Sequence, residues 1–109
     1  MYLLGYDIGS SSVKAAIVDA LTGVCVASDF YPKTEAPICA VQPGWAEQNP
    51  DDWFLYLKKA TASVLALSGV DAHDIKAIGI SYQMHGLVTV DRDGRLLRDA
   101  IIWCDSRGV

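Results

Sequence analysis

The chain has 109 residues, enough for one small domain with a hydrophobic core. Hydrophobic residues make up 51% and charged residues 20% of it, a composition that excludes an intrinsically disordered chain. The net charge of −4, without any basic stripe, argues against nucleic acid as a partner.

Cysteine usage and hydropathy predict the compartment. The three cysteines form no C-x-x-C pair, which argues against a disulfide framework or a zinc site and suits a reducing cytoplasm. No basic segment followed by an apolar one opens the chain, so no secretory signal is expected, and no apolar run is long enough to span a membrane. We therefore expect a cytoplasmic protein without membrane contact.

Three strands joined by tight turns are predicted first, over residues 2–8, 13–19 and 24–31. Together they form an antiparallel meander. The first strand is largely apolar on both faces before it reaches Asp7, so we expect it to lie centrally in its sheet.

An irregular segment and a helix follow. Residues 32–49 contain three prolines and resist regular structure, so this segment, which carries Trp45 and Glu47, is either a functional lip or a packed connector, with the connector slightly favoured. Asn49 is a good N-cap and Gly69 a good C-terminal stop, which predicts a helix between them. Apolar residues at spacings of four and three form a stripe that should pack on the sheet: Trp53, Leu57, Ala60, Val64 and Leu67.

The remaining strands are predicted at residues 75–82, 87–90 and 100–103. Residues 75–82 read as a buried strand, and the preceding helical crossover makes it a parallel neighbour of the first strand. Alternating strands and a helix in one mixed sheet indicate the α/β class.

A polar turn at the end of the first strand is the first candidate site. Gly9 permits a positive φ and a close approach to the backbone, and the N–H groups of Ser10, Ser11 and Ser12 could form an anion nest. The carboxylate of Asp7 would repel a phosphate unless a divalent cation such as Mg²⁺ lies between them. A plain hairpin turn is an equal alternative, because Asp and Ser are common turn residues. The turn is neither a P-loop nor a G-x-G-x-x-G fingerprint.

Two further polar clusters each follow an apolar strand and should lie on the same rim of the sheet. Gln83 and His85 could bind hydroxyls, and Met84 could pack on a sugar face. Asp105 and Arg107 could hold hydroxyls or phosphate. The alternatives are a solvated histidine and a surface ion pair of little energetic value, with Trp103 in the core.

Four motifs in order resemble the FGGY carbohydrate kinases of the actin/Hsp70/sugar-kinase superfamily. Residues 7–14 are similar to the first phosphate motif, and residues 45–53 to the stretch before the first helix. Residues 80–86 resemble the sugar-binding Gln-Met-His-Gly of xylulokinases, and residues 100–107 resemble the family's Trp-x-Asp-x-Arg segment. Cys104 and Ser106 differ from the Asn and Gly that xylulokinases often carry.

The resemblance implies an RNase H-like mixed sheet, of which residues 1–109 would be the N-terminal part of the first kinase domain. It implies ATP-dependent phosphorylation of a ketopentose, with D-xylulose as the expected substrate and ATP and Mg²⁺ as cofactors. Asp7 would hold the metal. The residues facing ATP would be Asp7, Gly9, Ser10, Ser11, Ser12 and Lys14. The sugar site would comprise Gln83, Met84, His85, Trp103, Asp105 and Arg107.

The family's catalytic base and most of its adenosine site belong to positions downstream of Val109, so the resemblance assigns no catalytic residue to this chain. We expect the isolated chain to be inactive and to form a homodimer through an unpaired strand edge. The alternatives are an FGGY kinase for another pentulose, polyol or sugar acid, a non-catalytic sugar- or nucleotide-binding module, and a structural actin-like piece.

Overall fold

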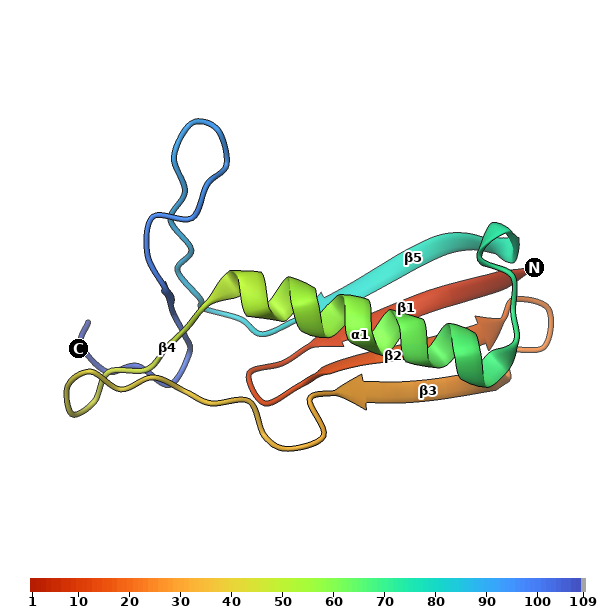
Figure 1. The fold of residues 1–109 in the computed structure, drawn as a ribbon, viewed down its shortest axis with the longest axis horizontal. Helices are drawn as coiled ribbons and strands as arrows, with labels where there is room; N and C mark the ends of the chain where they lie inside the picture. Colours follow the sequence, from red (N-terminus) through yellow and green to blue (C-terminus); the bar gives the residue numbers. More distant parts are fainter. Residues whose placement is uncertain (109) are drawn as a thin grey trace.

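Strand β1 (Tyr2–Ile8) lies inside a four-stranded sheet of order β3-β2-β1-β5 in the computed structural model, which describes residues 1–108 (Figure 1). β2 (Val13–Asp19) pairs antiparallel with β1 and with β3 (Cys25–Tyr31). β5 (Ile75–Tyr82) pairs parallel with β1. The predicted central strand, meander and parallel neighbour are confirmed, and β3 begins one residue later than predicted.

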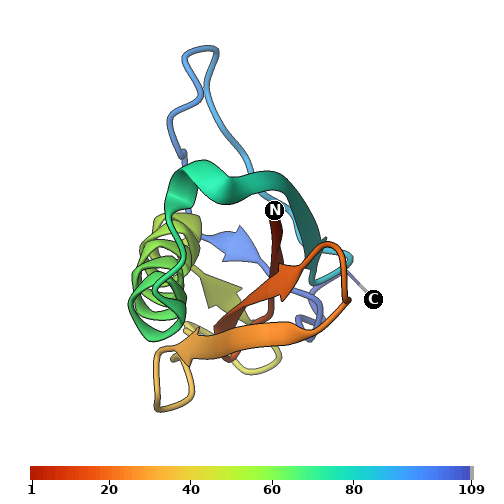
Figure 2. The same ribbon diagram turned by 90° about the vertical axis from the view of Figure 1, so that its right-hand side faces the viewer.

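Helix α1 (Pro50–Ser68) begins and ends where its capping residues predict. The Asn49 side chain accepts a hydrogen bond from the Asp51 N–H at 2.9 Å. Gly69 adopts a φ of 69° and donates its N–H to the carbonyl of Leu65 at 3.0 Å. The helix covers one face of the sheet, and the opposite face carries no helix within residues 1–108 (Figure 2).

The core lies between α1 and the sheet. It consists of Leu4, Tyr6, Ala15, Ile17, Ala60 and Val64. The predicted helical stripe is wrong at its last member, because Leu67 is 65% exposed. The physical reason is the direction of the buried face: Leu65 and Val70, on either side of Leu67 in the sequence, pack against the core in its place.

Strand β5 differs from the prediction of a buried strand. Ile78, Ile80 and Tyr82 are 59%, 57% and 73% exposed. The apolar run correctly predicts a strand, but β5 lies at the edge of the sheet and α1 packs mainly over β2 and β3. No other described element covers it. A short 3₁₀ helix, η1 (Ala72–Asp74), leads into this strand.

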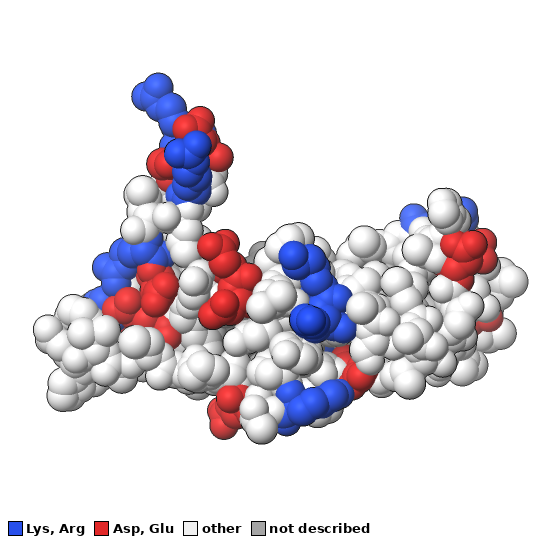
Figure 3. All heavy atoms as spheres, viewed as in Figure 1, with Lys and Arg blue, Asp and Glu red and all other residues white. Residues whose placement is uncertain are grey.

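A second, two-stranded sheet joins β4 (Glu47–Gln48) to β6 (Ala100–Ile101). The prediction of strands at 87–90 and 100–103 is therefore wrong in extent. Residues 87–90 make only isolated bridges, and Trp103 lies in a turn, because the intervening segment turns away from the sheet. Residues 87–99 form a protrusion that carries basic and acidic side chains side by side (Figures 1 and 3). None of the helices described over residues 1–108 is long and apolar enough to cross a membrane.

Candidate functional site

The β1–β2 turn, the end of β5 and the segment after β6 lie at one end of the large sheet (Figure 1). Parallel pairing places Ile8 opposite Tyr82, and the Gln83 N–H donates to the Ile8 carbonyl at 2.9 Å. The indole Nε1 of Trp103 donates to Ser10 Oγ at 3.3 Å. The three polar clusters expected on one rim are therefore adjacent in space.

Gly9 serves the turn differently from the expectation. It has no positive φ; a Cβ at this position would lie 3.2 Å from the carbonyl oxygen of Ser12. The Gly9 N–H donates to that same oxygen at 3.0 Å. The glycine therefore supplies room for a tight turn rather than a left-handed backbone.

The carbonyl groups of the turn are held from the protein side. Gln48 Nε2 donates to the Ser10 carbonyl at 2.6 Å, and the Ala36 N–H donates to the Ser11 carbonyl at 2.8 Å. The turn thus packs against the connector before α1, which buries Ala46, Glu47 and Gln48. The packed-connector interpretation of residues 32–49 is confirmed for residues 45–49, whereas residues 37–44 are exposed.

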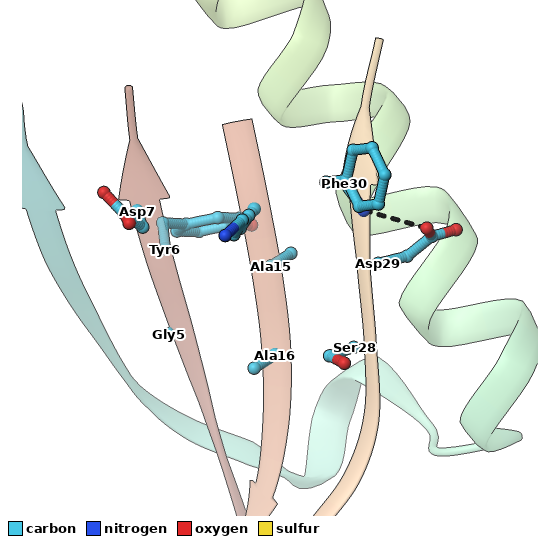
Figure 4. Close-up of a pocket in the computed structure, with 9 residues that line it drawn as sticks. Gly5, Tyr6, Asp7, Ala15, Ala16, Ser28, Asp29 and Phe30 are labelled. Carbon is cyan, nitrogen blue, oxygen red and sulfur yellow. Dashed lines mark hydrogen bonds between the residues drawn. The ribbon is translucent and has the colours of Figure 1, made fainter. Parts of the chain in front are cut away.

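Asp7 and Lys14 are opposite one another on β1 and β2, and both are exposed. They line a depression of about 630 Å³ on the sheet face away from α1. Gly5, Ala16 and Ser28 are in register across three strands and form its floor (Figure 4). Asp7 projects from β1 close to the turn of residues 9–12 (Figure 4). Among the described residues there is no cluster of three or more side chains that could bind a metal ion.

The segment after β5 has an unusual local structure. His85 has a φ of 62°, a left-handed conformation that is uncommon outside glycine. Both polar atoms of the Gln83 side chain are buried without a hydrogen-bond partner. Such a group costs roughly 1–3 kcal/mol unless a partner satisfies it. Met84, by contrast, is 67% exposed.

The segment after β6 is organised by an ion-pair cluster. Arg107 donates from Nε and Nη2 to the Asp105 carboxylate at 2.6–3.0 Å and from Nη2 to Glu47 Oε2 at 2.7 Å. The Ala46 N–H donates to Asp105 Oδ2 at 2.6 Å. The Arg107 guanidinium also stacks 3.8 Å from the centre of the Trp45 ring.

The cluster is strongly charge-stabilised. Hydrogen bonds from Arg107 hold the pKa of the Asp105 carboxyl well below its usual range, against the opposing effect of desolvation. Arg107 is also the largest cause of the lowered pKa of Glu47, and Asp105 raises the pKa of Arg107. The Asp105 side chain is only 2% exposed and that of Arg107 19%, so the alternative of a plain surface ion pair is wrong. Trp103 is 58% exposed, so the alternative of a core tryptophan is wrong too.

Sequence reasoning missed the contribution of the connector to this end of the sheet. Glu47 also pairs with Arg98, Nη2 to Oε2, at 3.1 Å, and Gln48 reaches the turn. The signal available in the sequence was a carboxylate and an amide, Glu47 and Gln48, in a short stretch bounded by Pro43 and Pro50. Their contacts at this end of the sheet, from Gln48 to Ser10 and from Glu47 to Arg107, join residues 38 and 60 positions apart, so local spacing could not predict them.

Three comparisons place this chain among known proteins. Residues 2–109 match the FGGY family of carbohydrate kinases, N-terminal domain. The chain is 40% identical over 106 residues to a xylulose kinase of Bacillus subtilis, covering 97% of this chain and 20% of that protein. It therefore spans about a fifth of the length of the curated relatives it matches.

Solved structures agree with the sequence match. A xyloylose kinase from Brucella ovis aligns with a TM-score of 0.88 at 34% identity, over 98% of this chain and 22% of that one. A gluconate kinase from Lactobacillus acidophilus aligns with a TM-score of 0.82 at 30% identity, over 95% of this chain and 20% of that one. The chain belongs to the FGGY family of carbohydrate kinases and carries the fold of their N-terminal domain.

Proposed function

We propose that the protein carrying this domain transfers the γ-phosphate of ATP to a hydroxyl of a ketopentose, converting D-xylulose to D-xylulose 5-phosphate. The observation that carries the proposal is the contact between Trp103 and Ser10, which joins the segment that would face the sugar to the turn that would face the phosphates. Family membership and the xylulose kinase relatives support the same reaction.

The nucleotide half of the proposed site is the turn with its neighbours. Gly9, Ser10, Ser11 and Ser12 would face the ATP phosphates, with Lys14 supplying positive charge beside them. Asp7 would hold Mg²⁺. A single exposed carboxylate fits this ion, because Mg²⁺ commonly takes one or two carboxylates and completes its shell with phosphate oxygens and water. When bound, the ion would neutralise charge on the transferring phosphoryl group.

The sugar half comprises the two other clusters. Gln83 carries an unpartnered amide able to exchange hydrogen bonds with a sugar hydroxyl. Met84 and Trp103 offer exposed apolar surface for a sugar face. His85 would bind a hydroxyl. Asp105 and Arg107 would act at the margin of the sugar site, since their polar atoms are already bonded to each other, to Glu47 and to Ala46.

The resemblance assigns residues 1–109 to the N-terminal part of a first kinase domain. The base that orients the attacking hydroxyl, and most of the adenosine site, would come from downstream positions. Phosphoryl transfer depends on positioning and charge stabilisation from both halves of the site. We therefore propose that residues 1–109 alone do not turn over substrate.

The test is a phosphorylation assay of the full-length protein with Mg²⁺–ATP over D-xylulose, other pentuloses, glycerol and gluconate. D-xylulose should give the highest kcat/KM. Asp7→Ala should abolish turnover while leaving sugar binding largely intact, and His85→Ala should mainly raise the KM for sugar. Asp93→Ala, on the protrusion, is the control. Unchanged kinetics in both site variants would show the rim assignment to be wrong.

A sugar acid is the second candidate substrate. The gluconate kinase of Lactobacillus acidophilus aligns nearly as well as the Brucella ovis enzyme, with TM-scores of 0.82 and 0.88. The fold of this domain therefore does not separate the two substrates. A higher kcat/KM for gluconate than for D-xylulose in the same assay would favour this candidate.

We also propose that the isolated domain dimerises through β5. Its outer edge pairs with no strand among residues 1–108, and Ile78 and Ile80 are exposed beside it. Unpaired edges promote pairing with another chain. Light scattering at high concentration should give twice the monomer mass; a strictly monomeric domain contradicts this proposal.

A further inference from the structure

Gln48 is a buried residue whose side-chain amide nitrogen and oxygen are both hydrogen-bonded. It is 6% exposed. Its Nε2 donates to the carbonyls of Ser10 at 2.6 Å and Pro37 at 3.3 Å, and its Oε1 accepts from Trp53 Nε1 at 2.9 Å. Burying an amide is favourable only when such partners are present, so the contacts define one orientation of this side chain.

The bond to Ser10 determines which way the turn presents its N–H groups. The peptide unit that joins Ser10 to Ser11 is trans, so its C=O and N–H point in opposite directions. With the Ser10 carbonyl held by Gln48, the N–H of Ser11 points away from the protein interior. The bond from Ala36 to the Ser11 carbonyl turns the N–H of Ser12 outward in the same manner.

Gln48 is also tied to the other half of the site. It belongs to β4, where it pairs with Ala100 of β6. β6 leads directly to Trp103, whose indole reaches the hydroxyl of Ser10. Ser10 is therefore held from two directions, by the amide of Gln48 on its carbonyl and by Trp103 on its side chain.

We propose that Gln48 is a positioning residue for the phosphate-binding turn: it fixes the peptide unit after Ser10 so that the N–H of Ser11 faces the nucleotide phosphates, beside the N–H of Ser12 that the Ala36 bond orients. This inference rests on the proposed kinase function. Gln48 itself lies behind the turn and does not touch the nucleotide.

The experiment compares two changes in the full-length protein. Gln48→Glu keeps an acceptor for Trp53 but loses the donor to Ser10, and it places a carboxylate against two carbonyls. Trp53→Phe removes the bond between Trp53 and Gln48, together with part of the aromatic ring, and leaves the donor to Ser10 in place. Gln48→Met, similar in size and uncharged, serves where the glutamate variant does not fold.

Isothermal titration with Mg²⁺–ADP should show a roughly tenfold weaker Kd for Gln48→Glu and Gln48→Met, the effect expected for one lost hydrogen bond. The Kd for sugar should stay within about twofold, and Trp53→Phe should leave both values within about twofold. Equal loss of nucleotide and sugar binding, an unchanged Kd for ADP in both Gln48 variants, or the same effect in Trp53→Phe overturns the proposal.

A second readout separates this proposal from the kinase assignment. In protein labelled with ¹⁵N-serine and free of nucleotide, the amide resonance of Ser11 should shift in the Gln48 variants and stay in place in Trp53→Phe. That result is expected even if no sugar in the panel is phosphorylated. An unmoved Ser11 resonance would show that Gln48 does not orient the turn, whatever reaction the protein performs.

Discussion

Replacing Gly44 with alanine is expected to destabilise the domain by about 2–3 kcal/mol, from two sources that the structure separates. Gly44 has a φ of 83°, and a left-handed backbone costs a non-glycine residue roughly 1–2 kcal/mol. A Cβ at this position would also lie 2.6 Å from Ser106 Oγ. The hydroxyl would have to rotate and would lose its 3.0 Å hydrogen bond to the Gly44 carbonyl, worth about 1 kcal/mol.

Urea unfolding of the Gly44, Gly23 and Ser106 variants measures both the backbone cost and the steric cost. Gly23→Ala is the control for the backbone part alone, because Gly23 has a φ of 74° and no atom within 4 Å of its added Cβ. In a Ser106→Ala background, Gly44→Ala should lose the steric part, giving a coupling of about 1 kcal/mol in the double-mutant cycle. Equal losses at Gly44 and Gly23, with no coupling to Ser106, would refute the reasoning.

Two further predictions concern the sheet. Ile17→Ala should lower the free energy of unfolding by about 3 kcal/mol, since Ile17 is fully buried and the loss of three carbons leaves a cavity. Val26→Ala, at a position 42% exposed, should lower it by about 1 kcal/mol or less. Similar losses for the two variants in urea unfolding would contradict the assigned core. The pKa of Asp29 is lowered from 3.8 to about 2, chiefly by Lys33, so its stabilising contribution should be complete above pH ~4 and lost as the pH falls toward 2. Asp29→Asn should flatten that part of the stability profile, and an unchanged acid slope would show that this carboxylate does not contribute.

Local patterns predicted the elements whose causes are local. Asn49 and Gly69 determined the ends of α1, and the apolar faces of residues 2–8 identified the central strand. The burial of β5 could not be predicted in the same way, because the exposure of Ile78 depends on which strands α1 covers, and α1 packs over β2 and β3. Periodicity identifies an apolar strand but not its neighbours.

The candidate site likewise has features that local sequence patterns predicted and features that they did not. A parallel β1–β5 pair was enough to predict that Asp7 and Gln83 share a rim, and the pairing confirms that geometry. The role of Gly9 was misjudged, because its constraint is the carbonyl of Ser12 rather than a positive φ. The left-handed backbone at His85 was not predicted, since histidine carries no intrinsic preference strong enough to signal it.

The small β4–β6 sheet has a consequence for the order of events in folding. Its strands have two residues each, and the ion pair from Arg107 to Glu47 that accompanies it closes a loop of 60 positions. Closing such a long loop costs conformational entropy before the contacts that stabilise it can form. The β1–β2–β3 meander closes only short turns, so its entropy cost is smaller. β1, β2 and β3 should therefore form before the small β4–β6 sheet. In native-state hydrogen exchange the amide of Ile102, bonded to the Ala46 carbonyl, should exchange faster than the amides between β1 and β2. On a ribosome, the β1–β2–β3 meander would therefore assemble while the segment that forms β6 was still being synthesised.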